Sequence, residues 1–323
     1  MKVLIFGGAG YIGAHAVVEL LDAAYDVVVF DNFSSGERLN IDPRAEIFKG
    51  DILSNYDLKM VFSKYDFDSV MHFSALKAAG ESMTNPQEYS NTNLVGSINI
   101  INHMIDNNIF KFIFSSSAAV YGDPISDKIN EDHPLRPTNF YGFTKLKIEQ
   151  LLDWYSQLFG LRFVALRYFN AAGYDLQSRI KIPETNSANL IPKIMEVIKG
   201  ERKKLKIFGG NYNTVDGTCV RDYIHVTDLA LAHIGSLKYL DHKENKSIVL
   251  NLATGGGHSV LEVIRAIEKI SGQKIPFEIV DRRKGDPPKL VSGTQFETFP
   301  IDWEPLYSDL DVIIKSVLKT YDV

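Results

Sequence analysis

Three glycines near the N-terminus constrain the fold of this chain more than any other feature. They stand at positions 7, 10 and 13, directly after an apolar run at 2–6 and directly before an amphipathic stretch at 11–23. A strand, a glycine turn and a helix in this order are typical of a dinucleotide-binding unit. Gly7 permits the tight turn, Gly10 lets a pyrophosphate approach the backbone, and Gly13 lets the helix pack on the strand. The pyrophosphate is expected at the positive end of the helix.

The end of the next expected strand indicates which dinucleotide is bound. The run Val27–Phe30 is followed directly by Asp31. An acid at this place accepts hydrogen bonds from the adenosine ribose hydroxyls and repels a 2′-phosphate. The sequence therefore predicts NAD, rather than NADP, as the cofactor.

A second motif predicts a group that transfers protons. Tyr141 and Lys145 are one helical turn apart, so both side chains lie on one face. A lysine ammonium beside a phenol favours the phenolate and lowers its pKa from about 10 toward neutrality. A phenolate can take a proton from a substrate hydroxyl, and Ser117 is expected to act with it. The same spacing occurs in ordinary surface helices, and the glycine turn is what favours the catalytic interpretation.

Apolar runs alternate with helical patterns through the first half of the chain. Strands are expected at 46–49, 68–73, 111–114 and 162–169, and helices near 55–65, 86–107 and 139–158. This alternation predicts an α/β fold with a Rossmann-type, doubly wound parallel sheet. Ligands should bind beyond the carboxyl ends of its strands. His72, inside an apolar strand, is expected to be a packed core histidine.

The pattern becomes looser after about residue 171. Long polar loops are expected at 174–186 and 209–218, where recognition residues often lie. Helical patterns return near 188–199, 227–240, 259–271 and 309–320. We therefore expect an NAD-binding domain at 1–171 and a smaller C-terminal substrate-binding domain at 172–323, with NAD at the floor of the cleft between them.

Composition excludes several classes of function. The 323 residues carry a formal net charge of −5 without a basic stripe, so nucleic acid is not an expected partner. Apolar runs are too short for a membrane span, and the N-terminus is typical of a core strand rather than a signal peptide. The single cysteine, Cys219, excludes an internal disulfide, and without a Cys/His cluster no metal site is expected. These features favour a cytoplasmic enzyme.

Two charged segments in the second half are candidates for binding substrate. They are Val220–His225 and Arg282–Asp286. Arginine forks bind a diphosphate through paired hydrogen bonds, and Asp286 could accept bonds from a ribose diol. Purely structural roles would be a salt bridge at Arg221 and Asp222, a solvated loop at Arg282 and Lys284, and a helix cap at Asn189.

Beyond these motifs, the chain resembles the extended short-chain dehydrogenase/reductases almost from end to end. Among them it is most similar to the UDP-glucose 4-epimerases (UDP-galactose 4-epimerases). The similar segments are 7–13, 31–32, 50–52, 72–82, 115–122, 141–145, 167–173 and 216–230. The segments 72–82 and 216–230 are the most specific to the epimerases.

The resemblance implies that the chain interconverts UDP-glucose and UDP-galactose with a tightly bound NAD. Catalysis would fall to Ser117, Tyr141 and Lys145. Contacts to NAD would come from Tyr11, Ile12, Asp31, Asn32, Asp51, Ile52, Phe73, Lys77, Tyr141, Lys145 and Phe169. Contacts to the UDP-sugar would come from Ser117, Tyr141, Asn170, Asn189, Leu190, Ile207, Phe208, Arg221, Arg283 and Asp286. A homodimer through paired helices is also implied, with 86–107 and 139–158 as candidates.

Departures from the family pattern bear on the substrate and the reaction. The loop 174–186 lacks the usual Gly/Asp-rich run. Leu290 stands where the family varies, beside the sugar's position-2 substituent, and leaves less room for an N-acetyl group than a cysteine would. A 4,6-dehydratase would carry an Asp-Glu pair where Ala118-Ala119 stands. Two further hypotheses stay open: an epimerase for UDP-glucuronate or N-acetylhexosamines, and a non-catalytic NAD sensor.

Overall fold

The larger part of the molecule is built on a parallel sheet. In the computed structural model, which describes residues 1–184, 187–283 and 286–323, seven strands lie in the order β11–β6–β5–β4–β1–β2–β3. They are β1 (Lys2–Phe6), β2 (Asp26–Asp31), β3 (Glu46–Lys49), β4 (Ser69–His72), β5 (Lys111–Ser117), β6 (Arg162–Tyr168) and β11 (Ile248–Leu252). The chain runs outward from β1 to β3, then crosses back to β4 and runs outward the other way. The predicted doubly wound, Rossmann-type sheet is confirmed.

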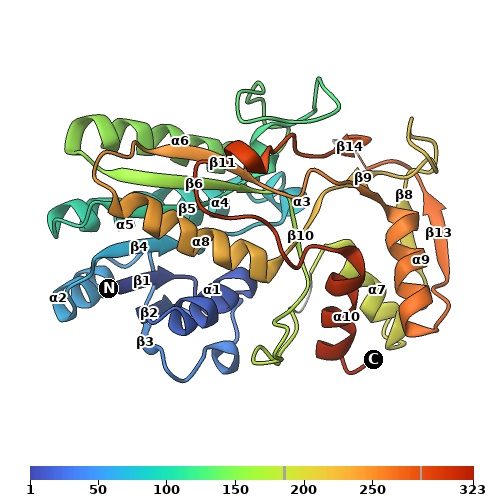
Figure 1. Ribbon diagram of the computed structural model, residues 1–323, viewed down its shortest axis with the longest axis horizontal. Helices are drawn as coiled ribbons and strands as arrows, with labels where there is room; N and C mark the ends of the chain where they lie inside the picture. The colour runs from blue at the N-terminus through green and yellow to red at the C-terminus, as the bar shows by residue number, and fades with distance from the viewer. Residues whose placement is uncertain (185–186, 284–285) are drawn as a thin grey trace.

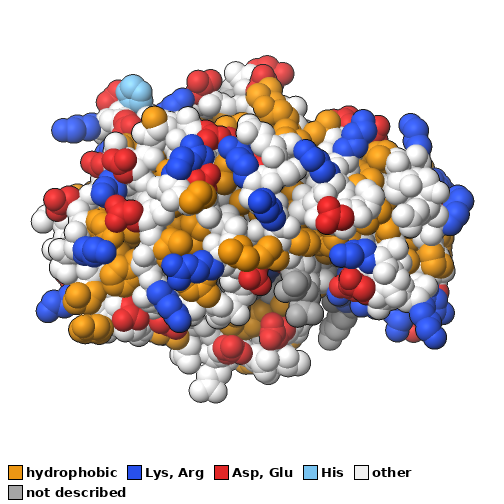
Figure 2. Space-filling view, turned by 90° about the horizontal axis from the view of Figure 1, so that it is seen from below, with side chains coloured by type: hydrophobic (Ala, Val, Ile, Leu, Met, Phe, Trp, Pro, Cys, Tyr) orange, Lys and Arg blue, Asp and Glu red, His pale blue; other side chains and the backbone are white. Residues whose placement is uncertain are grey.

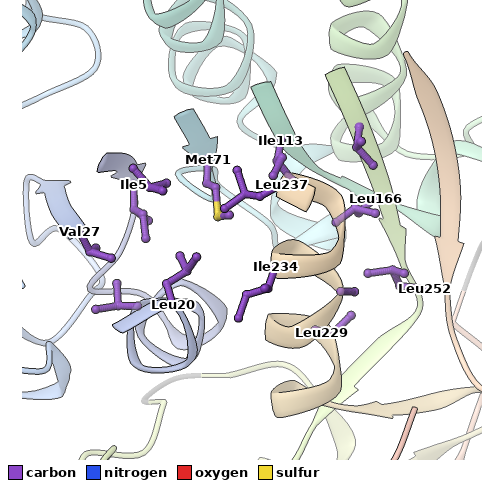
Figure 3. Close-up of a cluster of buried hydrophobic side chains, with 14 of the residues drawn as sticks. Ile5, Leu20, Val27, Met71, Ile113, Leu166, Leu229, Ile234, Leu237 and Leu252 are labelled. Atoms are coloured by element: carbon purple, nitrogen blue, oxygen red, sulfur yellow. The ribbon is translucent and has the colours of Figure 1, made fainter. Parts of the chain in front are cut away.

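Helices cover both faces of this sheet, which is why its strands are apolar on both sides. One face carries α1 (Tyr11–Asp22) and α8 (Val226–Asp241), and the other carries α2 (Asn55–Lys64), α5 (Gly96–Asp106) and α6 (Phe140–Phe159). Figure 3 shows the first layer, where Leu20 of α1 and Ile234 of α8 meet beneath Ile5 and Met71 of the strands. The core therefore lies in two layers, one on each side of the sheet.

The smaller lobe packs beside the carboxyl edge of the sheet (Figure 1). Its helices are α7 (Leu190–Ile198), α9 (Val260–Ser271) and α10 (Leu310–Thr320). Its short strands pair as β8 (Leu205–Phe208) with β13 (Phe277–Val280), β7 (Asn170–Ala172) with β10 (Tyr223–His225), and β9 (Val220–Arg221) with β12 (His258–Ser259) and β14 (Lys289–Leu290). Short helical turns complete the chain: η1 (Arg38–Asn40), α3 (Ala79–Ser82), α4 (Pro86–Tyr89), η3 (Ala118–Val120) and η4 (Phe296–Thr298).

Helix α1 belongs to both lobes. Val17 and Leu20 pack in the core of the sheet, whereas Ala14 and Val18 pack in the core of the smaller lobe with α9 and α10. The two sets of residues lie on different sides of one helix, because successive residues are about 100° apart around the axis. The placement of α1 therefore fixes how the lobes meet.

The expected elements are found with two differences. The helix expected near 86–107 is divided into α4, a π-helical stretch η2 (Ser90–Val95) and α5. In addition, two elements from the second half of the sequence belong to the larger lobe. Strand β11 pairs with β6 at the edge of the sheet, and α8 packs on one face of the sheet. His72 is a core histidine as expected, with burial lowering its pKa to about 3 and Nε2 lying 2.8 Å from Ser97 Oγ. The division into an NAD-binding domain at 1–171 and a substrate-binding domain at 172–323 remains a prediction.

A buried carboxylate ties three loops together beneath β9. Asp222 is fully buried, and its Oδ1 accepts hydrogen bonds from Thr254 N and Oγ1 at 2.8 and 2.7 Å. Its Oδ2 accepts from Gly255 N at 2.9 Å and from Ser292 N at 3.2 Å. Asp222 is therefore a structural anchor and forms no salt bridge with Arg221, which pairs with Asp286 instead.

We expect Asp222→Ala to lower the free energy of unfolding by about 3 kcal/mol or more. Three backbone N–H groups, that of Ser292 buried and those of Thr254 and Gly255 partly buried, would lose their acceptor, at roughly 1–3 kcal/mol for each fully buried group. Urea unfolding followed by circular dichroism measures the change. The matched control is Asp26→Ala at an exposed position of β2, for which a change within about 0.5 kcal/mol is expected. Similar losses in both variants would contradict the anchoring role.

Candidate active site

A cavity of about 630 Å³ lies between the carboxyl edge of the sheet and the smaller lobe. Its lining includes many of the residues singled out from the sequence: Tyr11, Ile12, Lys77, Ser117, Tyr141, Phe169, Asn170, Asn189, Leu190, Ile207, Phe208, Arg221, Arg283 and Asp286. These residues come from positions between 11 and 286, so the fold brings both halves of the chain to one place. Its position beyond the strand ends is the one expected for a doubly wound sheet.

The glycine turn has the geometry that a pyrophosphate requires. Gly7 adopts a φ of 81°, a conformation that other residues rarely take. At Gly13 an added Cβ would collide with the carbonyl oxygen of Gly7, so only glycine lets α1 approach β1 this closely. At Gly10 an added Cβ would meet only that same oxygen, at 3.3 Å, and would otherwise fill the space above the turn. This space, at the N-terminus of α1, fits the phosphates of NAD.

Acidic and polar side chains continue from this turn along the strand ends. Asp31, at the end of β2, is buried and accepts hydrogen bonds from Ala9 N at 2.9 Å and Phe33 N at 2.8 Å. Burial raises the pKa of this carboxyl, and the two N–H donors oppose the shift. Asn32 donates to Asp51 Oδ2 at 3.1 Å. These oxygens form an acidic rim suited to ribose hydroxyls.

Helix α6 brings Tyr141 and Lys145 to the end of β5, where Ser117 lies. The helix begins at the cap Asn139, whose Oδ1 accepts from Gly142 N at 2.9 Å. An added Cβ at Gly142 would collide with the carbonyl oxygen of Ala119, so a glycine is needed for this close approach. Tyr141 and Ser117 reach the cavity, and Lys145 lies behind them.

Burial is the main influence on the pKa values of Tyr141 and Lys145 in the protein without cofactor. Burial raises the pKa of Tyr141, and a hydrogen bond with Ser117 opposes the shift. Burial also lowers the pKa of Lys145 to about 7, and the charge of Glu149 opposes this. Burial therefore outweighs, in the protein without cofactor, the lowering of the Tyr141 pKa that was expected from Lys145. Lys145 Nζ donates to Ser115 O at 2.6 Å and lies 5.9 Å from the centre of the Tyr141 ring.

The opposite wall of the cavity is basic and aromatic. Arg221 donates to Asp286 Oδ1 at 3.2 Å and to Pro287 O at 2.9 Å. The Arg283 guanidinium lies 4.3 Å from the centre of the Phe208 ring. Asn189 precedes α7 without a side-chain capping bond, so its amide is available to the cavity. Two arginines beside an aromatic ring are suited to bind a diphosphate that carries a planar base.

The charge of the cavity is opposite to that of the whole chain. Among the described residues its lining holds six basic side chains and two acidic ones. The basic residues are Lys77, Lys193, Arg202, Lys206, Arg221 and Arg283, and the acidic ones are Glu184 and Asp286. The face shown in Figure 2 instead mixes the two signs of charge. A net charge of −5 thus coexists with a cavity that attracts anions.

Some candidate residues lie outside this lining. Asp31, Asn32, Asp51, Ile52 and Phe73 lie farther along the strand ends, Lys145 is buried, and the three glycines form the turn before α1. Leu290 pairs in register with Arg221 and packs against the cluster that contains Phe169 and Ala118, but it is not part of the cavity lining. Residues 185–186 of the polar loop and Lys284–Gly285 of the 282–286 segment lie outside the described residues.

The polar loop expected at 174–186 is present in its described part, but sequence reasoning missed the contacts through which this part of the chain joins the two lobes. We call residues 173–184 the strap. Tyr11 Oη donates to Gly173 O at 2.5 Å, and Asp175 N donates to His15 Nε2 at 3.0 Å. Asn40 bonds both the N–H and the carbonyl of Ile182, at 2.9 and 2.8 Å. No local motif marks these contacts, because the partners are more than 140 residues apart.

Ion pairs hold the same segment. Arg179 pairs with Asp175 at 2.7 Å and with Asp22 and Glu19 of α1. Near its end, Glu184 pairs with Lys77 at the edge of the cavity. Glu149 of α6, also missed, carries the buried pair with Arg167. Its signal in the sequence was its position one helical turn after Lys145.

The sequence and the fold are both similar to known proteins. A family model described as the NAD dependent epimerase/dehydratase family matches residues 3–253. The UDP-glucose 4-epimerase of Lacticaseibacillus casei is 43% identical over 322 residues, which cover 100% of this chain and 97% of that protein.

Two solved structures have the same fold over nearly their whole length. UDP-glucose 4-epimerase from Brucella ovis in complex with NAD is 38% identical, with a TM-score of 0.94 over 98% of this chain and 96% of that one. The enzyme from Bifidobacterium longum in complex with NAD+ and UDP is 37% identical, with a TM-score of 0.92 over 100% and 98%. These similarities confirm the resemblance seen in the sequence. The chain belongs to the NAD dependent epimerase/dehydratase family.

Proposed function

We propose that this protein interconverts UDP-glucose and UDP-galactose by inverting carbon 4 of the sugar with bound NAD. One observation carries the proposal: Tyr141 and Ser117 face the same cavity as Arg221 and Arg283, with Lys145 behind them. A proton acceptor and a diphosphate-binding wall thus share one space. The full-length similarity to UDP-glucose 4-epimerases supports the same substrate.

The chemistry that NAD supplies when bound is reversible oxidation at carbon 4. Tyr141 would accept the proton of the 4-hydroxyl, and Ser117 would share that hydrogen bond. Because burial raises the pKa of the Tyr141 phenol still further from neutrality, the positive nicotinamide ring is the charge that would favour its phenolate. Tyr141 would then return the proton to the oxygen at carbon 4 when the keto group is reduced.

Inversion requires the 4-keto sugar to present its other face. We propose that Arg221 and Arg283 hold the diphosphate while Phe208 and Ile207 hold the base, so that the sugar alone turns. Asp286 and Asn189 would contact the nucleotide, and Leu190 and Asn170 the remaining wall. Binding free energy from the fixed nucleotide then supports chemistry at the mobile sugar.

Two competing functions are less well supported by the described site. A 4,6-dehydratase needs an acid next to the serine, where Ala118 and Ala119 form the short helix η3 instead. A non-catalytic NAD sensor would have no use for a tyrosine and a serine placed together at a basic cavity. Turnover of UDP-galactose separates the enzyme from the sensor.

We expect Tyr141→Phe to keep its fold and NAD content and to lose turnover by roughly 10²–10⁴-fold, because the ring remains and only the proton acceptor is removed. The measurement is kcat for UDP-galactose, with NAD content determined on the same sample. Tyr239→Phe, at a tyrosine of α8 outside the cavity, is the control and should retain wild-type kcat. A kcat within a few-fold of wild type for Tyr141→Phe would rule out Tyr141 as the base.

We also propose a cytoplasmic homodimer. The only cysteine, Cys219, is free and buried, so the fold uses no disulfide, which supports the cytoplasmic location.

The candidate dimer interface is on helix α6, which presents Trp154 and Leu158 to solvent with exposed fractions of 60% and 67%. Tyr155 of α6 donates to Asn102 of α5 at 2.5 Å and joins the two helices into one surface. Large apolar side chains gathered on an outer helix face are typical of an interface.

We expect Trp154→Glu to shift the protein from dimer to monomer in sedimentation velocity, because a charge would have to be buried at the interface. Leu39→Glu is the control, since this leucine is 78% exposed on η1, away from α6. A wild-type monomer, or a Trp154→Glu dimer as stable as wild type, would contradict the proposed interface.

Leu290 addresses which sugars are accepted. It pairs in register with Arg221, which lines the cavity, and packs against the cluster that contains Phe169, and we propose that its size limits the space beside the sugar. We expect wild type to process N-acetyl sugars poorly and Leu290→Ala to raise kcat/KM for UDP-N-acetylglucosamine relative to UDP-glucose, because a clash with the larger substrate is removed. Efficient N-acetyl turnover by wild type, or a loss of stability in the variant without a change of ratio, would refute this role.

A further inference from the structure

A buried carboxylate that the proposed mechanism does not use lies directly behind the reacting groups. Glu149 follows Lys145 by one helical turn and Tyr141 by two, so all three share one face of α6. Only 4% of its side chain is exposed. Burying a carboxylate is costly unless it is paired and hydrogen-bonded, so its partners indicate what it holds.

Its partners are on the two strands that end at the cavity. Glu149 Oε1 accepts from Ser116 Oγ of β5 at 2.5 Å and from Arg167 Nε of β6 at 3.0 Å. Its Oε2 accepts from Arg167 Nη2 at 2.7 Å. The neighbouring residue of β5, Ser115, accepts the hydrogen bond of Lys145. Two successive residues of β5 are thus bonded to two successive turns of α6.

The strand segment held in this way leads directly to Ser117. Ser115 O and Ser116 Oγ bond α6, and the next hydroxyl, Ser117, faces the cavity beside Tyr141. A sliding or rotation of α6 against β5 would break both bonds and separate Tyr141 from Ser117. We propose that Glu149 is a positioning residue for the reaction, because it fixes the end of β5 against the face of α6 that carries Tyr141 and Lys145.

The charge of Glu149 also acts on Lys145. The groups that face the Lys145 ammonium are Tyr141 and Glu149 on α6, His72 on β4 and, beyond Glu149, Arg167 on β6. His72 is neutral because burial lowers its pKa. Glu149 raises the pKa of Lys145 against the effect of burial. Removing this negative charge would therefore let Lys145 lose its proton at lower pH.

The first test separates positioning from stability with two matched variants. Ser116→Ala removes the hydroxyl that joins Glu149 to β5. Tyr121→Phe removes another buried hydroxyl of the same network, which accepts from Arg167 Nη1 at 2.8 Å and donates to Asn251 Oδ1 at 2.6 Å. We expect Ser116→Ala to lower kcat by roughly tenfold or more, with KM for UDP-galactose and NAD content unchanged, because small misplacements of reacting groups are costly. Tyr121→Phe should lower the unfolding midpoint and leave kcat within about twofold of wild type, because its hydroxyl bonds residues of β6 and β11 and bonds neither β5 nor α6.

The second test uses Glu149→Gln, which keeps the shape and removes the charge. Lys145 bonds the end of β5 through Ser115 O as an ammonium group, and without the charge of Glu149 it would lose its proton at lower pH. We therefore expect the alkaline loss of kcat in Glu149→Gln to begin at lower pH than in wild type. An unchanged profile, or equal kcat values in Ser116→Ala and Tyr121→Phe, would overturn the proposal. Should Glu149→Gln fail to fold, the comparison of Ser116→Ala with Tyr121→Phe decides alone.

The inference rests on the proposed epimerase activity, and the same assays separate the two. A wild-type protein that does not convert UDP-galactose would refute the activity. A wild-type protein that does convert it, is inactivated by Tyr141→Phe and is unaffected by Ser116→Ala would refute only the positioning role.

Discussion

The close contact between the first helix and the first strand is the constraint on which the rest of the structure depends. Gly13 rests on the carbonyl oxygen of Gly7, and any side chain there would push α1 away. The helix so placed supplies Val17 to the core of the sheet and Ala14 to the core of the smaller lobe. One backbone contact therefore determines both the phosphate-binding turn and the angle at which the two lobes enclose the cavity.

The fold could be predicted from the sequence wherever its signals are local. The glycine turn, the alternation of strands and helices, and the Tyr141–Lys145 spacing each act over a few residues, and the structure places them as expected. The sequence did not predict that β11 joins the larger sheet or that α8 packs against it, since strand order depends on packing between distant segments. The π-helical interruption before α5 likewise had no signal of its own.

The candidate site shows the same limit in its electrostatics. Spacing alone suggested that Lys145 lowers the pKa of Tyr141, yet the structure directs the ammonium to Ser115 O and buries both groups. The extent of burial is a property of the assembled fold, and desolvation outweighs a charge that points elsewhere. The basic lining of the cavity could not be predicted either, because the chain has a net charge of −5 and the basic residues of the lining are spread from Lys77 to Arg283.

The strap, residues 173–184, has a kinetic consequence. Its hydrogen bonds to Tyr11, His15 and Asn40 and its ion pairs through Arg179 attach it to α1 and η1, the segments that follow the glycine turn. Gly173, Tyr174 and Glu184 of the strap line the cavity, so a ligand held against them would be released when this segment opens. Such local opening has its own free energy, smaller than that of global unfolding. The residence time of a bound dinucleotide would then follow the opening rate of this one segment, and could be long even if each contact with the ligand were weak.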